Sequence, residues 1–504
     1  MKRALFFYIT LGLVILSISL AVSNFDFDLW ARLIAGMGVI DGHHVLKNDF
    51  LSYTPVHTWY DHEWGSGVIF YFFLKHFGGY SLIFLQAALM FGIFFTLSRI
   101  VKLRGTKSPY NIVFYLVGLL SVIQTLNNPI RCHMFSFLFF SIFLYILEKA
   151  RRGSQKLVYL LPLMTIFWNN IHGGIVSGIG LILIFATGEF LNRKPVKHYL
   201  ISFLLSSLAL IINPWGFEYI KFLLMANTMQ RVHIAEWWSI FHKIHLKRHL
   251  LFKFFMFSII VLEALNLKKY GKNFKDLYEK EDKVKWILFF VTIYLGISHL
   301  KLMPFFVIFA ICYAYDDFYK LIENVKLPNW KENAIYSVLI LTSLLSFVVK
   351  DFSLPVNYSA YPVREVEFVK INNLKGKLLV NFGLGSYASY KLYPHNKIFM
   401  DGRYEEVYYD FMVPMLKRFY LGEAGWNDIL IEYTPDVMIL EQYYPVFDHL
   451  ANSNDWRLVY KGNKFGVFVK SGEVRDKYVM PTDDLNYYKS NLFETEIDLR
   501  KNEK

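Results

Sequence analysis

Long apolar runs recur along this chain of 504 residues, and each is about as long as a helix that crosses a lipid bilayer. The runs are centred near residues 13, 90, 118, 140, 165, 183, 206, 259, 292, 308 and 342. Hydrophobic residues make up 55% of the sequence and the mean hydropathy is +0.31, which is more than a soluble globular protein carries. The sequence therefore predicts a polytopic α-helical membrane protein with about eleven transmembrane helices.

Lysine and arginine residues fall in every second connection between these runs, beginning with Lys2 and Arg3 before the first run. The positive-inside rule places such connections in the cytoplasm, and with them the amino terminus. After eleven spans, the region from about residue 352 lies outside the cell, as does the first connection. We therefore expect a multi-pass protein of the plasma (inner) membrane. The net charge of +13 is then explained by cytoplasmic lysines and arginines that face anionic lipid, and nucleic-acid binding is not needed to explain it.

The first run, residues 4–22, has a second interpretation as a signal peptide. Lys2 and Arg3 precede it, and Ala21-Val22-Ser23 resembles a cleavage site of small residues. The run is long for the apolar part of a signal peptide, and removing it would leave the rest of the topology unchanged. The chain has only two cysteines, Cys132 and Cys312, so the sequence predicts no disulfide framework and no zinc site.

Three regions follow from these patterns: a transmembrane domain over residues 1–351 with a first external loop at 24–66, an extracytoplasmic α/β domain at 352–470, and a polar, loosely packed tail at 471–504. Strand-like runs in the second region cover 377–382, 397–400, 436–440, 456–460 and 465–470, and the last two read as a hairpin. The pair Gly383 and Gly385 follows a strand, but the rest of a nucleotide-binding pattern is missing. A tight turn explains these glycines better.

The first external loop is rich in acidic and histidine residues beside the membrane. Asp26 and Asp28 lie two positions apart between apolar residues, so an extended backbone would place both carboxylates on one side. Two carboxylates in that arrangement can hold a divalent cation or set an acid beside a base. Asp26, Asp28 and His43 (or His44) could supply oxygen and nitrogen ligands, for which Mg²⁺ or Mn²⁺ is the natural choice.

Further polar residues gather at the other external helix ends. Ionisable groups near a membrane are costly and commonly line a cavity or pair with one another, which suggests one shared outward-facing cavity. The same residues have a plainer interpretation as helix caps, interfacial anchors or contacts to lipid headgroups. The group includes Asn127, Asn128, Arg131, His133, Trp168, Asn169, Asn170, His172, Asn213, Trp215, Glu218, Arg231, His233, Glu236, Trp237, Trp238, His299 and Lys301.

Several motifs in this order resemble the bacterial polytopic glycosyltransferases of the GT-C superfamily, a group that includes mannosyltransferases and aminoarabinose transferases. The resemblance spans residues 24 to about 470, and its individual motifs are loose. The matching pieces are Asp26-Phe27-Asp28-Leu29-Trp30-Ala31-Arg32-Leu33, Asn48-Asp49-Phe50-Leu51-Ser52-Tyr53-Thr54, Asp61-His62-Glu63-Trp64, Arg131-Cys132-His133-Met134-Phe135-Ser136, Trp168-Asn169-Asn170-Ile171-His172-Gly173-Gly174, Asn213-Pro214-Trp215-Gly216, Asp401-Gly402-Arg403-Tyr404 and Trp456-Arg457-Leu458-Val459-Tyr460.

The resemblance implies an enzyme that moves a sugar from a polyprenyl-phosphate donor to a glycan, lipid or protein acceptor on the external face. In that superfamily an acidic residue of the first external loop is essential, as a base or as a metal ligand, and by position this is Asp28 or Asp26. His62 and Glu63 would support the base or complete a metal site. Arg131, Arg231 and Lys301 are the candidate phosphate partners. Trp64 is a candidate for stacking on the sugar, and His172 is a further candidate substrate-binding residue.

Two other functions remain open at the level of sequence. A polysaccharide polymerase or ligase also acts outside the membrane, and the connection with Arg231, His233, His242, His245, Arg248 and His249 partly satisfies its need for external arginine and histidine. A transporter or flippase of lipid-linked substrates would show internal repeats and broken helices near the middle of the membrane. Pro162 and Pro304 interrupt spans, but we find no repeat, and the polar residues lie at helix ends.

Overall fold

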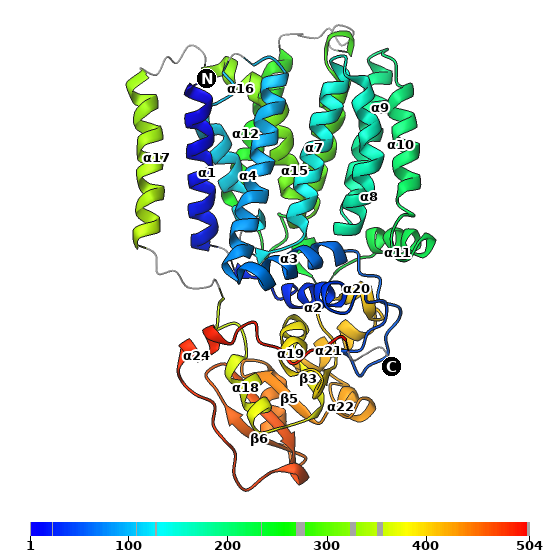
Figure 1. Cartoon of the computed structure of the whole chain (residues 1–504), viewed down its shortest axis with the longest axis vertical. Helices are drawn as coiled ribbons and strands as arrows, with labels where there is room; N and C mark the ends of the chain where they lie inside the picture. Colours follow the sequence, from blue (N-terminus) through cyan, green and yellow to red (C-terminus); the bar gives the residue numbers. More distant parts are fainter. Residues whose placement is uncertain are drawn as a thin grey trace. The chain divides into compact units, whose positions relative to one another are not determined.

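The computed structural model describes residues 2–22, 24–106, 108–126, 129–232, 234–268, 278–322, 329–349 and 356–500. The chain forms two compact units (Figure 1). We call the first, Met1–Ser23 with Ser81–Ser353, the helical unit. The second, Asn24–Tyr80 with Leu354–Lys504, is the mixed unit, because it combines helices with a β-sheet.

The helical unit contains the apolar runs of the sequence, which form helices of different lengths. Helix α1 packs along α17, and α9 packs against α7, α10 and α14 (Figure 1). Its elements are α1 (Lys2–Val22), α4 (Tyr80–Leu103), α5 (Ile112–Ser121), α6 (Ile123–Leu126), β2 (Pro129–Ile130), α7 (His133–Arg151), η1 (Gln155–Leu160), α8 (Leu161–Ile171), α9 (Ile175–Leu191), α10 (Lys197–Ala209), α11 (Phe217–Thr228), η2 (Ala235–Trp237), α12 (Leu250–Leu267), α14 (Lys283–Ser298), η4 (Leu300–Leu302), α15 (Met303–Phe309), the π-helical turn η5 (Ala310–Ala314), α16 (Tyr315–Ile322) and α17 (Asn329–Val349).

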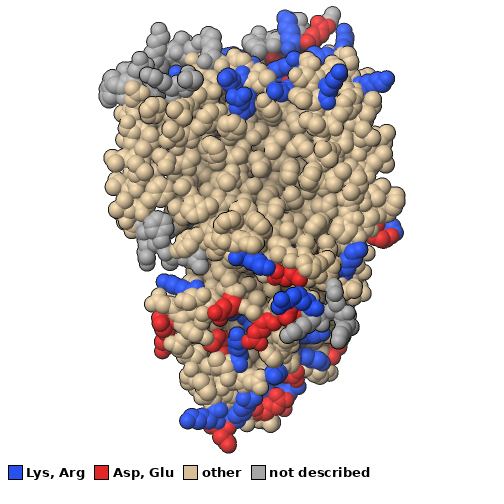
Figure 2. Space-filling model, in the orientation of Figure 1, with Lys and Arg blue, Asp and Glu red and all other residues tan. Residues whose placement is uncertain are grey.

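Every expected span centre falls inside one of these helices. Among the described residues, four helices are long and apolar enough to cross a membrane, namely α1, α4, α7 and α12. Helices α5, α9 and α17 are apolar but shorter, so the expected number of about eleven spans is not shown. The four long helices support a membrane protein, and the broad uncharged band on the face seen in Figure 2 agrees with that conclusion.

The charged residues at one end of the helical unit pair with one another. Arg151, at the end of α7, contacts Glu189 of α9 at 3.0 Å and Asp282, which precedes α14, at 2.8 Å. Thus α7 and α9 end, and α14 begins, at the same end of the unit, as the alternating topology requires. Figure 2 shows lysine and arginine side chains collected at the end of this unit where α9 and α16 lie.

A second ion-pair group lies on α12, α14 and α16. The Nζ atom of Lys285 donates to Glu263 at 2.6 Å and to Asp317 at 2.9 Å, and all three side chains are buried. Asp317 is therefore not a solvated side chain at a helix end, because the ammonium group of Lys285 compensates its buried charge.

The mixed unit places a small β-sheet among short helices. Its elements are β1 (Asn24–Phe25), α2 (Leu29–Ile40), α3 (Trp64–Phe77), α18 (Val363–Ile371), β3 (Gly376–Val380), η6 (Phe382–Leu384), α19 (Gly385–Leu392), β4 (Asn396–Ile398), α20 (Tyr404–Val407), α21 (Met412–Leu421), α22 (Asp428–Glu432), β5 (Val437–Glu441), α23 (Pro445–Ala451), β6 (Trp456–Lys461), β7 (Phe465–Lys470), η7 (Ser471–Glu473) and α24 (Leu485–Ser490).

The five strands of the sheet follow the order β4-β3-β5-β7-β6. Strand β3 is parallel to both β4 and β5, whereas β7 is antiparallel to β5 and β6. The central strand β5 is buried along its whole length, which is typical of a strand covered on both faces. All five strand-like runs of the sequence form strands, and the predicted hairpin is confirmed as β6 and β7.

The first external loop belongs to the mixed unit rather than to the helical unit, which differs from the expected boundary at residue 351. Helices α2 and α3 of the mixed unit cross at glycines. A Cβ atom on Gly36 would lie 2.2 Å from the carbonyl oxygen of Gly67, and a Cβ atom on Gly67 would lie 2.4 Å from the carbonyl oxygen of Arg32. Backbones can approach this closely only where both helices lack side chains.

The tail after residue 470 is packed in its described part, up to residue 500, which corrects the expectation of a loose segment. Leu492 and Leu499 are buried. The Nζ atom of Lys391 donates to the carbonyl oxygens of Asn491 and Glu494, at 2.7 and 2.8 Å. The ring of Phe493 lies 5.8 Å from that of Trp30. Apolar residues placed singly in a polar segment therefore anchor this tail.

Candidate functional site

The first external loop and the segment 398–408 are joined by backbone hydrogen bonds. Ile398 N donates to Leu51 O at 2.9 Å, Tyr53 N donates to Ile398 O at 3.0 Å, and His57 N donates to Val407 O at 3.0 Å. The side chain of Thr54 also donates to Phe399 O at 2.7 Å. The loop therefore lies alongside the sequence that follows β4, and this contact brings the charged residues of the two segments together.

Arg32 of α2 lies at the centre of the first charged group in the mixed unit. Its guanidinium contacts Asp61 and Glu406, the latter at 2.8 Å, and its Nε atom lies 3.6 Å from a Glu63 oxygen. Arg32, Asp61 and Glu406 are all buried. Burial raises the pKa of Asp61 to about 6 even though Arg32 opposes that shift. Such a group is stable only while each charge keeps its partner.

His62 and Glu63 extend this group. His62 Nδ1 lies 3.0 Å from Glu406 Oε1, and His62 Nε2 lies 3.6 Å from Glu63 Oε1. Burial alone would lower the pKa of His62, but the negative charges of Glu406 and Glu63 outweigh it and raise the pKa to about 9. At neutral pH the imidazole is therefore protonated and forms an ion pair with Glu406.

The same three residues could hold a metal ion. One ligand atom from each of His62, Glu63 and Glu406 lies within 4.8 Å of the others. One nitrogen and two carboxylate ligands suit Mn²⁺ or Zn²⁺. A cation at this place would have to displace the His62 proton, because a metal-bound imidazole is neutral, and would compete with Arg32 for both carboxylates.

Arg403 is the centre of a second charged group, and its side chain is fully buried. Its guanidinium donates to Asp49 at 2.6 Å and to both oxygens of Asp401, at 2.9 and 3.0 Å. It also lies over the ring of Trp59, with 4.6 Å between Cζ and the ring centroid. The motif Asp401-Gly402-Arg403 thus fixes the first external loop at Asp49. The carboxylates of Asp49 and Asp401 balance the charge of Arg403.

Asp26 and Asp28 lie at the start of α2, but their backbone is not extended as the sequence suggested. The backbone N–H of Asp28 donates to Asp26 Oδ1 at 2.8 Å, and Asp28 has helical dihedral angles. The carboxylate of Asp26 therefore closes a turn at the start of α2. Asp28 lies against Gly402, where an added Cβ atom would be 2.1 Å from Asp28 Oδ1.

The structure does not bring His43 to these aspartates. His43 follows the carboxyl end of α2, while Asp26 and Asp28 precede its amino end. A helix of this length separates them by about 18 Å at 1.5 Å per residue. The expected ligand set of Asp26, Asp28 and His43 is therefore not formed, because α2 is an unbroken helix between its members.

Two more of the expected site residues lie at helix ends. Trp64 begins α3 and is half-buried. His172, in the helical unit, ends α8, and its Nδ1 atom lies 2.7 Å from Ser136 Oγ and accepts a hydrogen bond from Gly174 N at 2.9 Å. The Ser136 hydroxyl also accepts from Trp168 Nε1 at 2.7 Å. His172 thus orders the turn between α8 and α9.

The three expected phosphate partners gather in the helical unit around Trp237. Arg131 Nη1 donates to both carboxylate oxygens of Glu236 at 2.6 Å. Arg231 lies over the Trp237 ring at 4.4 Å and Lys301 at 5.5 Å. Burial would raise the pKa of Glu236, but Arg131 and Lys301 lower it to about 2. We call Arg131, Arg231, Glu236, Trp237 and Lys301 the Trp237 cluster; Asn127, Asn128 and His233 lie outside the described residues.

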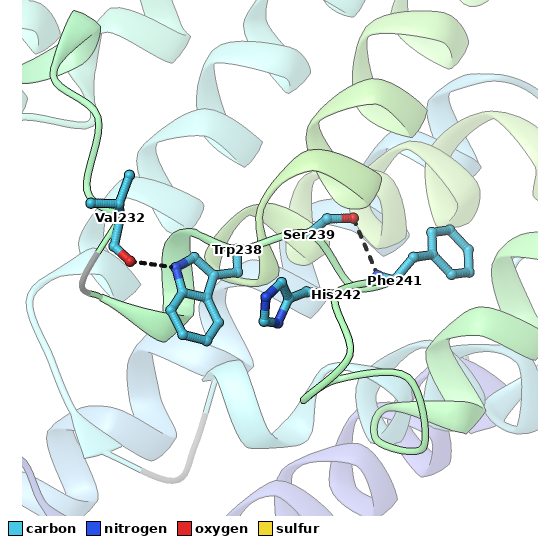
Figure 3. A pocket seen from close by; sticks show the side chains of 5 residues that line it. All are labelled: Val232, Trp238, Ser239, Phe241 and His242. Carbon is cyan, nitrogen blue, oxygen red and sulfur yellow. Dashed lines mark hydrogen bonds between the residues drawn. The ribbon is translucent and has the colours of Figure 1, made fainter.

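An open pocket of about 540 Å³ lies in the same connection and is shown in Figure 3. It is lined by Val232, Trp238, Ser239, Phe241 and His242. Two hydrogen bonds shape it: Trp238 Nε1 donates to Val232 O at 3.0 Å, and Phe241 N donates to Ser239 Oγ at 3.2 Å. Val232 and Phe241 are exposed, so the pocket offers apolar surface directly after Arg231 and Trp237 in the chain.

The fold and these groups define a predominantly helical protein with four membrane-length helices among the described residues. Its mixed unit contains buried ion pairs between segments that are distant in the sequence. A search of protein-family models finds none that matches the chain. No curated protein matches it either.

Sequence reasoning missed the role of Glu406, which contacts Arg32 and His62 and also accepts from Trp59 Nε1 at 3.0 Å. A usable signal was present. The segment Asp401-Gly402-Arg403-Tyr404-Glu405-Glu406 concentrates four charged side chains next to a buried strand. Charges that dense beside a core element need partners, and the first external loop holds the complementary ones.

Proposed function

We propose that this protein is a membrane glycosyltransferase of the GT-C type, which transfers a sugar from a polyprenyl-phosphate donor to a glycan, lipid or protein acceptor on the external face. The observation that carries the proposal is the Trp237 cluster. Two cationic side chains, Arg231 and Lys301, lie over the ring of Trp237, and Arg131 pairs with the adjacent Glu236. An apolar pocket follows in the same connection. A lipid phosphate needs both positive charge for its headgroup and apolar surface for its chain.

Within this proposal Arg131, Arg231 and Lys301 bind the donor phosphate. Arg131 is held by Glu236 in a two-oxygen contact, which fixes its guanidinium in place. Stacking on Trp237 likewise restricts Arg231, so less side-chain freedom is lost when a phosphate binds. These cations would stabilise the negative charge that develops on the departing phosphate.

Asp28 is the proposed base. It removes the proton from the acceptor hydroxyl as the acceptor oxygen forms a bond to the anomeric carbon of the sugar. The bond between that carbon and the phosphate oxygen breaks, its electron pair stays with the phosphate, and polyprenyl phosphate is released. Asp26 positions Asp28 through the hydrogen bond to its backbone. His62 and Glu63 position the loop through Glu406 and Arg32, and a divalent cation at His62, Glu63 and Glu406 would add positive charge there.

The test is transfer of radiolabelled sugar from purified polyprenyl-phosphate donors by the reconstituted full chain. Asp28→Asn should lose at least about 100-fold in turnover, the usual size of a general-base contribution, while donor binding is retained. The exposed Asp410→Asn is the matched control and should behave as wild type. If Asp28→Asn keeps full turnover, the base assignment is wrong. If the wild type consumes no donor of any sugar type, the glycosyltransferase proposal itself fails.

Arg231→Gln and Lys301→Gln separate phosphate binding from chemistry. Both should raise the donor KM more than they lower kcat, because the lost charge acts on the phosphate in the bound donor as well as in the transition state. Lys221→Gln is a suitable control, since Lys221 is exposed in the same unit and pairs with Glu218 within α11. If all three variants have the same donor KM as the wild type, the donor phosphate does not bind at the Trp237 cluster.

A polysaccharide polymerase or ligase is the second candidate, favoured by one observation. His242, His245 and His249 lie in series, with ring centroids 6.3 and 6.0 Å apart. The Nδ1 atom of buried His245 has no hydrogen-bond partner among the described residues, while its Nε2 atom lies 3.0 Å from Ala235 O. Joining of glycan chains that is lost in His245→Ala and retained in Asp28→Asn would support this candidate.

A further inference from the structure

In the sheet of the mixed unit, the connection that follows β3 and the connection that follows β4 run in opposite directions. The chain runs from β3 to β4 on one side and then crosses to β5 on the other side, and all three strands are parallel. In open sheets, ligands bind at the carboxyl ends of parallel strands where successive connections leave in opposite directions. Asn381 directly follows β3 and Glu441 is the last residue of β5, so both lie at this place.

The polar groups there are incompletely paired. Asn381 Nδ2 donates to Glu441 Oε1 at 2.8 Å. The second oxygen, Glu441 Oε2, is buried and has no hydrogen-bond partner among the described residues, and the same holds for the hydroxyl of Tyr420. Glu441 and Tyr420 are each only 4% exposed. A buried carboxylate oxygen without a donor is costly, and such groups commonly mark a binding function.

Aromatic rings connect the buried Tyr420, whose hydroxyl feels the charge of Glu441, to the surface. The ring of Tyr420 lies 4.8 Å from that of Tyr444, which in turn lies 4.4 Å from that of Tyr443. Tyr443 is 62% exposed, whereas Tyr420 is buried. We call Asn381, Glu441, Tyr420, Tyr443 and Tyr444 the strand-end cluster. It combines an amide, a carboxylate and tilted aromatic rings in contact with one another, all within one compact unit.

The chemistry of the strand-end cluster excludes a phosphate as the main ligand group. A carboxylate repels phosphate but accepts hydrogen bonds from hydroxyl groups. The neighbouring Gly385 has a φ of −59°, and an added Cβ atom would lie 2.3 Å from Met400 O, so this glycine serves packing and not a phosphate cradle. Burial raises the pKa of Glu441 to about 7, so the carboxyl group can exchange between accepting and donating near neutral pH.

We propose that the strand-end cluster is a binding site for a neutral sugar ring, with a sugar hydroxyl donating to Glu441 Oε2 and the apolar face of the ring stacked on Tyr443. Aromatic stacking together with a carboxylate and an amide matches a sugar, which presents a flat C–H face and adjacent hydroxyls. The site does not require the transfer reaction proposed above, because none of its residues belongs to the Trp237 cluster or to the start of α2.

The test uses the full chain in lipid nanodiscs and an array of immobilised neutral glycans with hexose, pentose and N-acetylhexosamine ends. We expect binding to at least one class, weakened at least 10-fold by Tyr443→Ala and by Glu441→Gln. Tyr443 is exposed, so its replacement does not depend on refolding of a core. Tyr409→Ala is the matched control, because Tyr409 is also exposed and stacks on Phe411 at 6.0 Å elsewhere in the mixed unit.

The proposal would be overturned if no glycan is bound above empty nanodiscs, if binding is unchanged in Tyr443→Ala, or if inorganic phosphate abolishes binding. Loss of binding in Tyr409→Ala to the same degree as in Tyr443→Ala would also overturn it, since it would show a general surface effect. The donor-transfer assay remains a separate readout. If Asp28→Asn loses transfer but binds glycan as strongly as the wild type does, the binding site and the transfer reaction are separate. The two proposals can therefore be tested independently.

Discussion

At the scale of single residues, the mixed unit is organised by buried charges. Arg403 joins Asp49 to Asp401, and Arg32 joins Asp61 to Glu406. Removing one partner of a buried pair costs about 3–5 kcal/mol, because the other charge stays in a medium of low polarity. These arginines therefore hold the first external loop in place. Two of its acidic residues, Asp49 and Asp61, pair with them, so not every acidic residue of the loop needs a catalytic role.

Glu365 provides a pH-dependent prediction at this scale. It is 4% exposed, and burial raises its pKa to about 7, above the value of about 4.5 in an unfolded chain. The folded state holds the proton more tightly, so the stabilisation is complete below pH 4.5 and is lost as the pH rises through 7. Its size is about 3 kcal/mol, since each pKa unit corresponds to about 1.4 kcal/mol.

We expect Glu365→Gln to have nearly the wild-type Tm at pH 5 and a higher Tm than wild type at pH 8, because glutamine carries no charge that must be buried. The Tm of the purified full chain, followed by tryptophan fluorescence, measures this difference. The exposed Glu473→Gln serves as the control and should show no such growth with pH. A Tm difference that is constant from pH 5 to pH 8 would contradict the assignment.

At the scale of elements, the crossing of α2 and α3 depends on Gly36 and Gly67. Gly67→Ala should destabilise the mixed unit by about 1–3 kcal/mol, the usual cost of overpacking, because the new methyl group meets the backbone carbonyl of Arg32 rather than a flexible side chain. The denaturant midpoint of the full chain in detergent measures this effect.

Gly180→Ala is the matched control for the helix crossing. Gly180 lies in α9, and an added Cβ atom there would meet nothing within 4 Å. The substitution should be neutral or stabilising, because alanine favours the helix by about 1 kcal/mol over glycine. Equal destabilisation by both substitutions would contradict this account, because Gly180 has no close neighbour and helix propensity favours alanine at both positions.

The sequence predicted helices and strands better than it predicted side-chain contacts. Apolar length located a helix at each expected span centre, and two strand-like runs on either side of a turn located β6 and β7, because both signals are local. The backbone of Asp28 was missed, since the Asp26 side chain closes a turn that hydrophobic pattern does not reveal. The pairing of Asp49 with Arg403 was beyond reach as well, because 354 residues separate them and one sequence carries no record of which distant charges meet.

At the scale of the whole molecule, the orientation in the membrane remains a prediction that labelling can test. Both native cysteines, Cys132 and Cys312, are buried and can be replaced. Asp476→Cys should then react with a membrane-impermeant maleimide on intact cells, whereas Lys156→Cys should react only after the membrane is permeabilised. Both positions are exposed in the structure. The reverse pattern would place the amino terminus and the mixed unit on the opposite sides from those expected.

The mixed unit is built from two pieces of chain, one ending at Tyr80 and the other beginning at Leu354. During synthesis the first piece therefore exists before its partner. At about 5–20 residues per second, the interval is on the order of 15–55 s. Throughout it, Arg32, Asp49 and Asp61 have none of the contacts to residues 401–406 seen in the finished protein. A ribosome pause, a slow codon or a holding chaperone would act on this protein mainly within that interval, while later steps would find the loop already enclosed.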